Sequence, residues 1–403
     1  MKKQHYVFKT IITIILTALI TCTITVLTLY GRTGNKSANN NIGSSMGSDI
    51  LNTKMKTIRE KINEVYIGEA NDEDLKEYAI KGYVAGLNDV YSEYFTAKEM
   101  KEFTEETLGN FVGVGINMIK DIEKNAIVIY STIKNTPAEA AGLKTGDVIT
   151  AVDGQKVSGE DFENIANMVK GKEGTKVKLT ILRDGQEKEY EIERKTIEII
   201  EASSEMISDN IGYLSLTSFD GNAAEQFEKE CEDLKNKGAK SLIIDLRNNG
   251  GGLVEEATKI GDLFTNKDET LLIQTDNQGK EIVTKAEKDK SIDMNVVVLV
   301  NKYSASASEI LASILKDNVD KASIVGTKTY GKGVIQTLFQ LADGSGLKLT
   351  TNEYFSPKHN KINKIGVEPD VVVEDKEFIY AGKIDKEKDK QLQKAIEILQ
   401  NKK

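Results

Sequence analysis

The stretch that decides the fold of this 403-residue chain is Ser241-Leu-Ile-Ile-Asp-Leu-Arg-Asn-Asn-Gly-Gly-Gly252. Its first six residues read as a short strand buried on both faces, and a helical pattern from Leu253 to Phe264 follows the glycines. A strand that leads straight into a helix is typical of an α/β core. The glycines either connect the two elements at positive φ or expose backbone amides to a ligand.

Strands and helices alternate on both sides of this stretch. Ile211–Phe219 alternates like a strand, and a helix is expected from about Ala223 to Lys237. Further strands are expected at Val296–Val300, Ile324–Val325, Val334–Phe339 and Leu347–Thr351. The sequence therefore predicts an α/β core over residues 198–375, followed by a helical tail over 376–403 whose apolar face is Leu392, Ala395, Ile396 and Leu399.

Residues 109–197 have the pattern of a small β-rich domain. Short alternating strands are separated by turns at Asp153-Gly154 and Asp184-Gly185, with one helix near Asp161 to Lys170. We expect this domain to be inserted before the α/β core.

The N-terminus has the features of a membrane anchor. Phe8–Tyr30 carries no charge after Lys9, and its length is close to the roughly 20 residues that cross a bilayer. Because lysines precede it, residues 1–9 are predicted to be cytoplasmic, 10–30 to span the cell membrane once, and the rest to lie on the extracytoplasmic side. A cleaved signal peptide is the alternative, although no small-x-small cleavage site follows the apolar run.

A tether and two helices are expected after the anchor. Residues 31–50 are rich in Asn, Gly and Ser, which predicts a flexible linker. In the helical region 51–108, a stripe of Leu51, Met55, Ile58, Ile62 and Val65 either packs on this chain or pairs with a second copy. A second helix is expected after Asn71, which suits an N-cap.

The composition excludes several classes of protein. The chain holds 54 basic and 63 acidic residues, a net charge of −9, so a nucleic-acid partner is not expected. Its two cysteines, Cys22 and Cys231, are not placed to form a disulfide, and its two histidines, His5 and His359, are too far apart for a metal site. We expect no metal and no cofactor. With only two histidines in the chain, a hydrolase mechanism that uses histidine as the base is disfavoured.

A serine and a lysine are the strongest candidates for chemistry. Ser306 and Glu309 fit a capping box, but Ala305 and Ala307 leave room for a substrate beside a hydroxyl at a helix N-terminus, where a nucleophile gains from the positive potential. Lys332, between two glycines, is either an exposed turn lysine or a general base. As a base it must be neutral, and burial is what lowers a lysine pKa from about 10.4.

Three further groups belong to this hypothesis. Gln336 lies on the same strand face as Lys332 and is either the partner of its amine or an exposed strand residue. Amides of the Gly250–Gly252 run, together with that of Ala307, are candidates for stabilising an oxyanion.

The segment from Gly326 to Lys332 also has the GxxxxGK spacing of a phosphate-binding loop. Gly333 stands where such a loop needs Ser or Thr, and a strand rather than a helix is expected next. The sequence therefore disfavours a nucleotide site.

With these residues in place, the chain resembles the C-terminal processing peptidases, which are tail-specific serine proteases with a PDZ domain. The resemblance covers about residues 51–375. The motifs that carry it are Phe111–Ile116, Thr136–Asp147, Asp245–Gly252, Ser304–Glu309, Thr329–Gly333 with Gln336, and Gly366–Asp370. The sequence departs from the family pattern at three places. The interval from Ser306 to Lys332 is one residue longer than expected, and Val90 stands where proline is usual. Lys358–Asn360 replaces the usual small turn that contains glycine.

The resemblance implies a ClpP/crotonase-like protease core with Ser306 as nucleophile, Lys332 as general base and Gln336 as its partner. It implies an oxyanion hole at Gly251 and Ala307. It also implies a PDZ domain in which the loop Gly113, Val114, Gly115 and Ile116 binds a substrate's terminal carboxylate, beside the helix near Phe162. Arg183 is a hypothetical sensor of the state of the PDZ domain.

The partners that follow are polypeptides with apolar C-termini, the membrane, a second copy in a homodimer, and an activating partner of unknown identity. The alternative function is a non-catalytic PDZ adaptor that binds protein C-termini.

Overall fold

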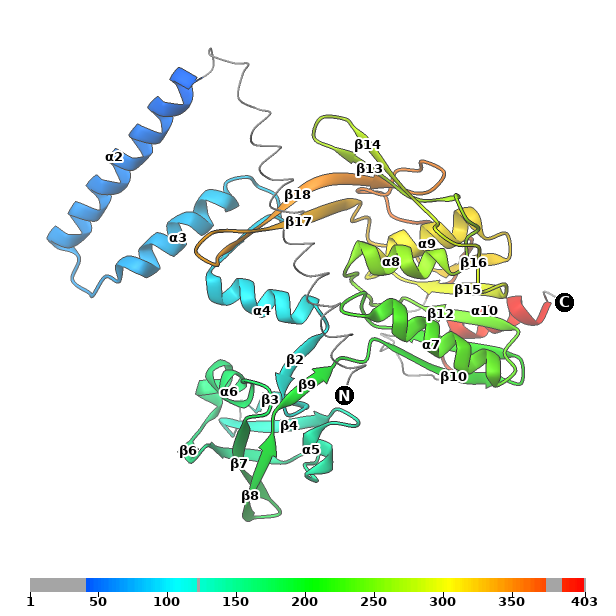
Figure 1. Ribbon diagram of the computed structural model, residues 1–403, viewed down its shortest axis with the longest axis horizontal. Coiled ribbons are helices and arrows are strands. Elements are labelled where there is room, and N and C mark those ends of the chain that lie inside the picture. The colour runs from blue at the N-terminus through cyan, green and yellow to red at the C-terminus, as the bar shows by residue number, and fades with distance from the viewer. Residues whose placement is uncertain (1–40, 122–123, 375–385, 402–403) are drawn as a thin grey trace, which may run out of the picture. The chain divides into compact units, whose positions relative to one another are not determined.

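The computed structural model describes residues 41–121, 124–374 and 386–401 (Figure 1). It divides into two compact units, with the boundary between Tyr78 and Ala79. The predicted membrane span of residues 10–30 lies outside the described residues. Among the helices that are described, none combines the length and the apolar character needed to cross a bilayer.

The first unit contains α2 (Asn41–Val65) and the start of α3 (Asp72–Ala85). The linker predicted over residues 31–50 is wrong from Asn41 onward, because that part is helical. Extending a helix that already exists costs less than nucleating one, so the helix over the later residues continues into this polar segment. The Asn71 cap is confirmed, since its Oδ1 accepts the amide of Glu73 at 2.9 Å. The side chains of Leu51, Met55, Ile58 and Val65 are exposed.

The β-rich domain is built on an antiparallel sheet with the order β3-β4-β5-β7-β8, and β6 pairs with β5. The Asp153-Gly154 and Asp184-Gly185 turns have positive φ at both residues, as two-residue hairpins require. The strands and helices are β2 (Asn110–Gly113), β3 (Ile116–Asp121), β4 (Ala126–Thr132), α5 (Pro137–Ala140), β5 (Val148–Val152), β6 (Gln155–Lys156), α6 (Phe162–Val169), β7 (Lys176–Arg183), β8 (Gln186–Glu193) and β9 (Lys195–Glu198).

The α/β core has a six-stranded sheet, parallel except at β10, with the order β10-β11-β12-β15-β16-β19. Its strands are β10 (Ala202–Ser208), β11 (Ile211–Leu216), β12 (Ser241–Asp245), β15 (Asn295–Val300), β16 (Ala322–Gly326) and β19 (Val371–Val372).

Both faces of this sheet are covered, which explains the continuous apolar run of β12. Leu242 and Ile244 belong to a core cluster with buried side chains of α7 (Ala223–Asn236), α8 (Val254–Asp262) and α9 (Ala307–Asn318). Ile243 packs in a separate cluster that includes side chains of α10 (Lys390–Asn401). The apolar stripe of the tail is therefore buried within its own chain.

A second, antiparallel sheet lies beside the core. It joins β1 (Glu93–Phe95), β18 (Gly346–Phe355), β13 (Thr270–Asp276) and β14 (Glu281–Lys285), with β17 (Val334–Gln340) also on β18. The short helix α4 (Ala97–Thr107) follows β1. The strands predicted at Val334–Phe339 and Leu347–Thr351 exist, but they form this sheet and not the parallel one. Because Lys332 leads into strand β17 and not into a helix, the phosphate-loop alternative is excluded.

Candidate active site

Ser306 stands at the junction between the loop after β15 and helix α9. Its backbone has φ 56° and ψ −117°, a conformation that residues with a Cβ rarely adopt. Such strain costs about 1 to 3 kcal/mol and persists only where surrounding contacts impose it. The side chain is 9% exposed. The neighbouring Ala305 and Ala307 are buried.

Glu309 connects the serine turn to the lysine loop. Its carboxylate is fully buried and accepts four hydrogen bonds. Oε2 accepts the amides of Ser306 and Lys332, both at 2.9 Å, while Oε1 accepts the Gly331 amide at 2.7 Å and the Thr329 hydroxyl at 2.6 Å. Burial raises the pKa of this carboxyl against the opposing effect of its donors. The sequence indicated only the helix cap; the link to the lysine loop was missed because it depends on tertiary contact.

Tyr354 of β18 makes a second connection between the same two segments. Its hydroxyl donates to the carbonyl of Lys332 at 2.6 Å and lies 3.1 Å from the carbonyl oxygen of Ser306. The ring is fully buried, and burial raises the pKa of its phenol. Together with Glu309, this tyrosine fixes the backbone of the predicted nucleophile relative to the predicted base.

Lys332 is half-buried, and its Nζ lies 4.7 Å from the centre of the Tyr91 ring. Burial lowers the pKa of the amine, and the charge of Lys348 lowers it further, whereas Asp89 and Glu309 oppose the shift. The direction is the one a general base requires. Within the described residues, Nζ makes no hydrogen bond to Ser306.

One pocket of about 530 Å³ brings the predicted groups together. Ser306, Lys332 and Gln336 all line it. Much of the rest of the wall is apolar, formed by Val90, Tyr91, Phe103, Leu253, Val254, Val334, Ile335 and Leu338. The Nε2 of Gln336 donates to Thr350 Oγ1 at 3.2 Å, and no hydrogen bond joins Gln336 to the Lys332 amine in the part of the chain that the structure describes.

The two predicted oxyanion donors, the amides of Gly251 and Ala307, differ in whether they already donate a hydrogen bond. The Gly251 amide donates to Asn249 Oδ1 at 2.9 Å in a local Asx turn. Gly251 nonetheless lies directly beside the serine: an added Cβ there would be 2.8 Å from Ser306 Cβ. The Ala307 amide, at the first turn of α9, has no acceptor among the described residues. It is therefore the better placed donor of the two.

Ser304 and Ser308, the two serines on either side of Ser306, have a structural role. Ser304 Oγ donates to the Leu246 carbonyl at 2.7 Å, and Ser308 Oγ donates to the Asn249 carbonyl at 2.9 Å. Both side chains are fully buried. These bonds hold the serine segment against the glycine loop.

The predicted peptide site of the β-rich domain has an open strand edge. Strand β3 is at the end of its sheet, so its outer side is unpaired within that sheet. The loop Gly113, Val114, Gly115 and Ile116 leads into it, and Gly115 has φ 85°. Phe162, the first residue of α6, is partly buried and packs against the core cluster that contains Ile116.

Arg183 is held inside the β-rich domain. Its Nε and Nη2 bind the two carboxylate oxygens of Asp147, each at 2.6 Å, and Nη2 also donates to the Gly142 carbonyl at 2.9 Å. These contacts give Arg183 a structural role within the β-rich domain. They do not connect its side chain to Ser306.

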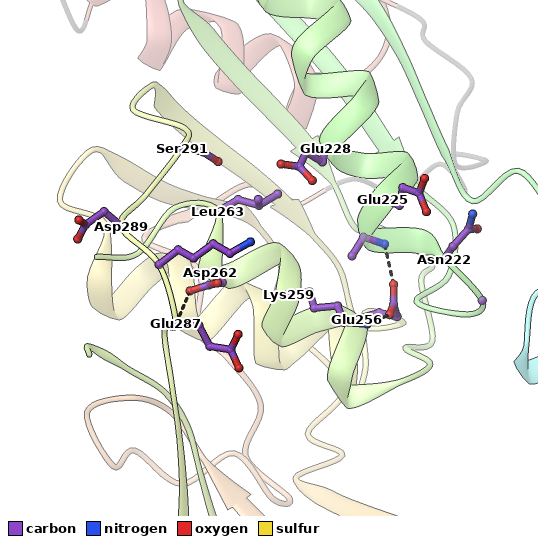
Figure 2. A pocket seen from close by; sticks show the side chains of 13 residues that line it. Asn222, Glu225, Glu228, Glu256, Lys259, Asp262, Leu263, Glu287, Asp289 and Ser291 are labelled. Atoms are coloured by element: carbon purple, nitrogen blue, oxygen red, sulfur yellow. Dashed lines mark hydrogen bonds and ion pairs between the residues drawn. The ribbon is translucent and has the colours of Figure 1, made fainter. Parts of the chain in front are cut away.

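A second pocket, of about 510 Å³, is lined mainly by charged side chains of α7, α8 and the segment near Glu287 (Figure 2). Its buried member, Glu256, accepts the Ala224 amide at 2.8 Å and pairs with Lys259 at 2.9 Å. Because this carboxylate is already satisfied and no predicted nucleophile or base lies there, the pocket does not compete with the Ser306 site.

Comparison with known proteins identifies two families in this chain. The sequence profile of peptidase family S41 matches residues 210–373, and that of the PDZ domain matches residues 111–193. The carboxy-terminal processing protease CtpA of Bacillus subtilis is 36% identical over 349 residues, which cover 86% of this chain and 74% of that protein.

Similar proteins also include a staphylococcal relative and a solved structure. A probable CtpA-like serine protease of Staphylococcus haemolyticus is 38% identical over 322 residues, which cover 79% of this chain and 64% of the relative. The chain thus spans somewhat less than two thirds of that relative's length. The solved structure of the photosystem II D1 C-terminal processing protease superposes with a TM-score of 0.46 at 28% identity, covering 79% of this chain and 86% of that one.

The chain therefore belongs to peptidase family S41 and carries a PDZ domain. Within that family, the chain belongs to the carboxy-terminal processing proteases, a group of serine-type peptidases.

Proposed function

We propose that this chain is a membrane-anchored serine endopeptidase that selects polypeptides by their C-termini and cleaves them with Ser306 and Lys332. The observation that carries the proposal is the shared pocket of these two residues. Ser306 stands there in a strained turn at a helix N-terminus, and the pKa of Lys332 is lowered by burial. Strain and a shifted pKa are features that concentrate at catalytic sites.

The chemistry follows from these two groups. Ser306 Oγ attacks the carbonyl carbon of the scissile bond while the neutral Lys332 amine takes its proton. The Ala307 amide and the N-terminus of α9 stabilise the negative charge on the carbonyl oxygen. Lys332 then gives the proton to the leaving amine, which breaks the C–N bond. In the second half, Lys332 takes a proton from the water that attacks the acyl ester. The bond between the carbonyl carbon and Ser306 Oγ then breaks, Lys332 returns the proton to Oγ, and the acyl group leaves as a carboxylic acid.

For Ser306 to transfer its proton directly, the Lys332 amine must turn from the Tyr91 ring toward the hydroxyl. Catalytic hydrogen bonds often form only when substrate is bound, so the separation in this structure is compatible with the mechanism. Gln336 would receive the amine by a similar side-chain rotation away from Thr350.

Substrate choice is assigned to the PDZ domain. A polypeptide would add its last residues as a strand along the open edge of β3, with its carboxylate at the amides of the loop that ends at Ile116. The buried side chains around Val114 and Ile116 and the half-buried Phe162 favour an apolar terminal residue. The apolar wall of the Ser306 pocket favours apolar residues at the cleaved bond.

The anchor, the extracytoplasmic location and a homodimer belong to the same proposal. The uncharged run at residues 10–30 supports the anchor, and the preceding lysines support its orientation. The exposed apolar stripe of α2 supports pairing with a second copy.

The test compares wild type with Ser306→Ala and Lys332→Met on an unfolded substrate with an apolar C-terminus. We expect both variants to lose hydrolysis while peptide binding, measured by fluorescence anisotropy, is retained. Equal hydrolysis by Ser306→Ala would refute the nucleophile. Binding without hydrolysis by the wild type would favour the non-catalytic adaptor.

A further inference from the structure

Lys348 is a second lysine in the wall of the Ser306 pocket. It projects from β18, and its Nζ lies 5.0 Å from the centre of the Phe95 ring and 5.1 Å from that of Phe103. These two rings stack on each other at 4.9 Å. Its Nζ also pairs with Glu93 Oε2 at 3.0 Å. Two aromatic faces and one carboxylate therefore hold this ammonium in place in the wall of the pocket.

The groups that act on Lys332 come from three sides. Asp89 and the Tyr91 ring belong to the loop before β1, Glu309 belongs to α9, and Lys348 and Tyr354 belong to β18. The two carboxylates and the aromatic face favour a protonated Lys332. Among these described groups, the cation Lys348 acts in the opposite direction, in addition to burial.

We propose that Lys348 is a positioning residue that acts through Lys332: its fixed positive charge in the pocket keeps the neighbouring amine in the neutral form that a general base requires. A nearby cation is an established way to activate a lysine. The inference rests on the proposed function and adds to it the charge that tunes the base.

A purely structural role for Lys348 is the competing explanation, because the Glu93 pair also ties β1 to β18. The two roles differ in their effect on pH dependence. Loss of a structural tie lowers activity equally at every pH, whereas loss of the charge moves the acid limb of the profile.

The experiment measures the pH dependence of kcat/KM for wild type, Lys348→Met, Lys348→Arg and Glu93→Gln. Lys348→Met should move the acid limb to higher pH, because Lys332 then holds its proton more tightly. A move of half a pH unit lowers kcat/KM about threefold at the acid end. Lys348→Arg keeps the charge and should restore the wild-type limb.

Glu93→Gln should move the limb to lower pH, since it removes the carboxylate that compensates Lys348. It also leaves Lys348 in place, so it carries the test if Lys348→Met folds poorly. Unchanged limbs in both Lys348→Met and Glu93→Gln would overturn the proposal.

A second readout does not depend on activity. Competitive acylation of lysines followed by mass spectrometry reports the titration of Lys332 in the Ser306→Ala background, with exposed Lys237 as the internal reference. The titration should move in the same directions as the acid limb. If wild type hydrolyses substrate but the Lys332 titration is the same in all variants, only the role of Lys348 fails. If wild type hydrolyses nothing, the proposed function fails instead.

Discussion

Arg247 and Asp389, 142 positions apart in the chain, form a buried ion pair between the glycine loop and the C-terminal tail. Nη1 donates to Asp389 Oδ1 at 3.0 Å, and Nη2 lies 2.8 Å from Oδ2. The same guanidinium binds Asp245 at 2.6 and 2.9 Å. The three side chains are at most 2% exposed. The tail is thus part of the support of the segment that leads to Gly251.

Asp389→Asn should destabilise the core, because a buried guanidinium loses one of its two carboxylates. Breaking a buried pair costs about 3 to 5 kcal/mol, and we expect a smaller loss here because Asp245 remains. Thermal unfolding measures it. Glu397→Gln, which removes an exposed charge from α10, the helix that follows Asp389, is the matched control and should leave Tm unchanged. Equal Tm values for both variants would contradict the support role.

Ser306→Gly should stabilise the protein while abolishing hydrolysis. The backbone at φ 56° and ψ −117° is strained for serine but open to glycine, so Ser306→Gly should gain about 1 kcal/mol in the free energy of unfolding. Ser306→Ala keeps a Cβ, and therefore the strain, and should be equally inactive without that gain. Chemical denaturation of both variants separates the two effects; an unstable glycine variant would argue against strain at this residue.

Glu309→Gln should lower catalysis through misplacement of the two reacting groups. One amide nitrogen of glutamine would face backbone N–H groups that now donate to a carboxylate oxygen. We expect a loss on the order of a hundredfold in kcat, in line with the cost of a displacement of about 1 Å. The control is Glu281→Gln, whose carboxylate is exposed beside His359. Wild-type kcat in Glu309→Gln would show that the hydrogen bonds of this carboxylate to the serine turn and the lysine loop are dispensable.

Lys332→Met should raise stability at neutral pH, with a gain that shrinks as pH rises. The pKa of this lysine is lower in the folded protein than in the unfolded chain. Unfolding therefore takes up a proton at pH values between the two pKa values, and this penalty disappears above the unfolded value of about 10.4. Solvent screening at the half-exposed amine reduces its size. Tm measured for both proteins across pH 7 to 10 tests the sign; a gap that widens with pH would contradict a lowered pKa.

Arg183→Ala should destabilise the PDZ domain, since Asp147 is only 1% exposed and would lose its bidentate partner. The loss of a charged hydrogen-bond partner by a buried group costs about 1 to 3 kcal/mol. Substrate-stimulated hydrolysis, measured below the unfolding temperature, tests the sensor role separately. Unchanged stimulation would remove that role and leave the structural one.

Local signals predicted much of this architecture. The run at Ser241–Leu246 predicted a buried strand, the Asp-Gly pairs predicted their hairpins, and the serine and lysine motifs do share one pocket. The parts that were missed depend on distant contacts. Tyr354 and Lys348 lie on a strand whose sheet is separate from the parallel one, and Asn249 occupies the Gly251 amide through its side chain. Neither relationship leaves a periodic pattern in the sequence.

The central claim is that Ser306 is the nucleophile and that Lys332 activates it. The most direct measurement is mass spectrometry of the intact enzyme and its peptides after reaction with a fluorophosphonate that labels activated serines. We predict one adduct, on Ser306, formed faster as pH rises and nearly absent in Lys332→Met. Labelling of another serine, or the same rate at Ser306 without the Lys332 amine, would contradict the account.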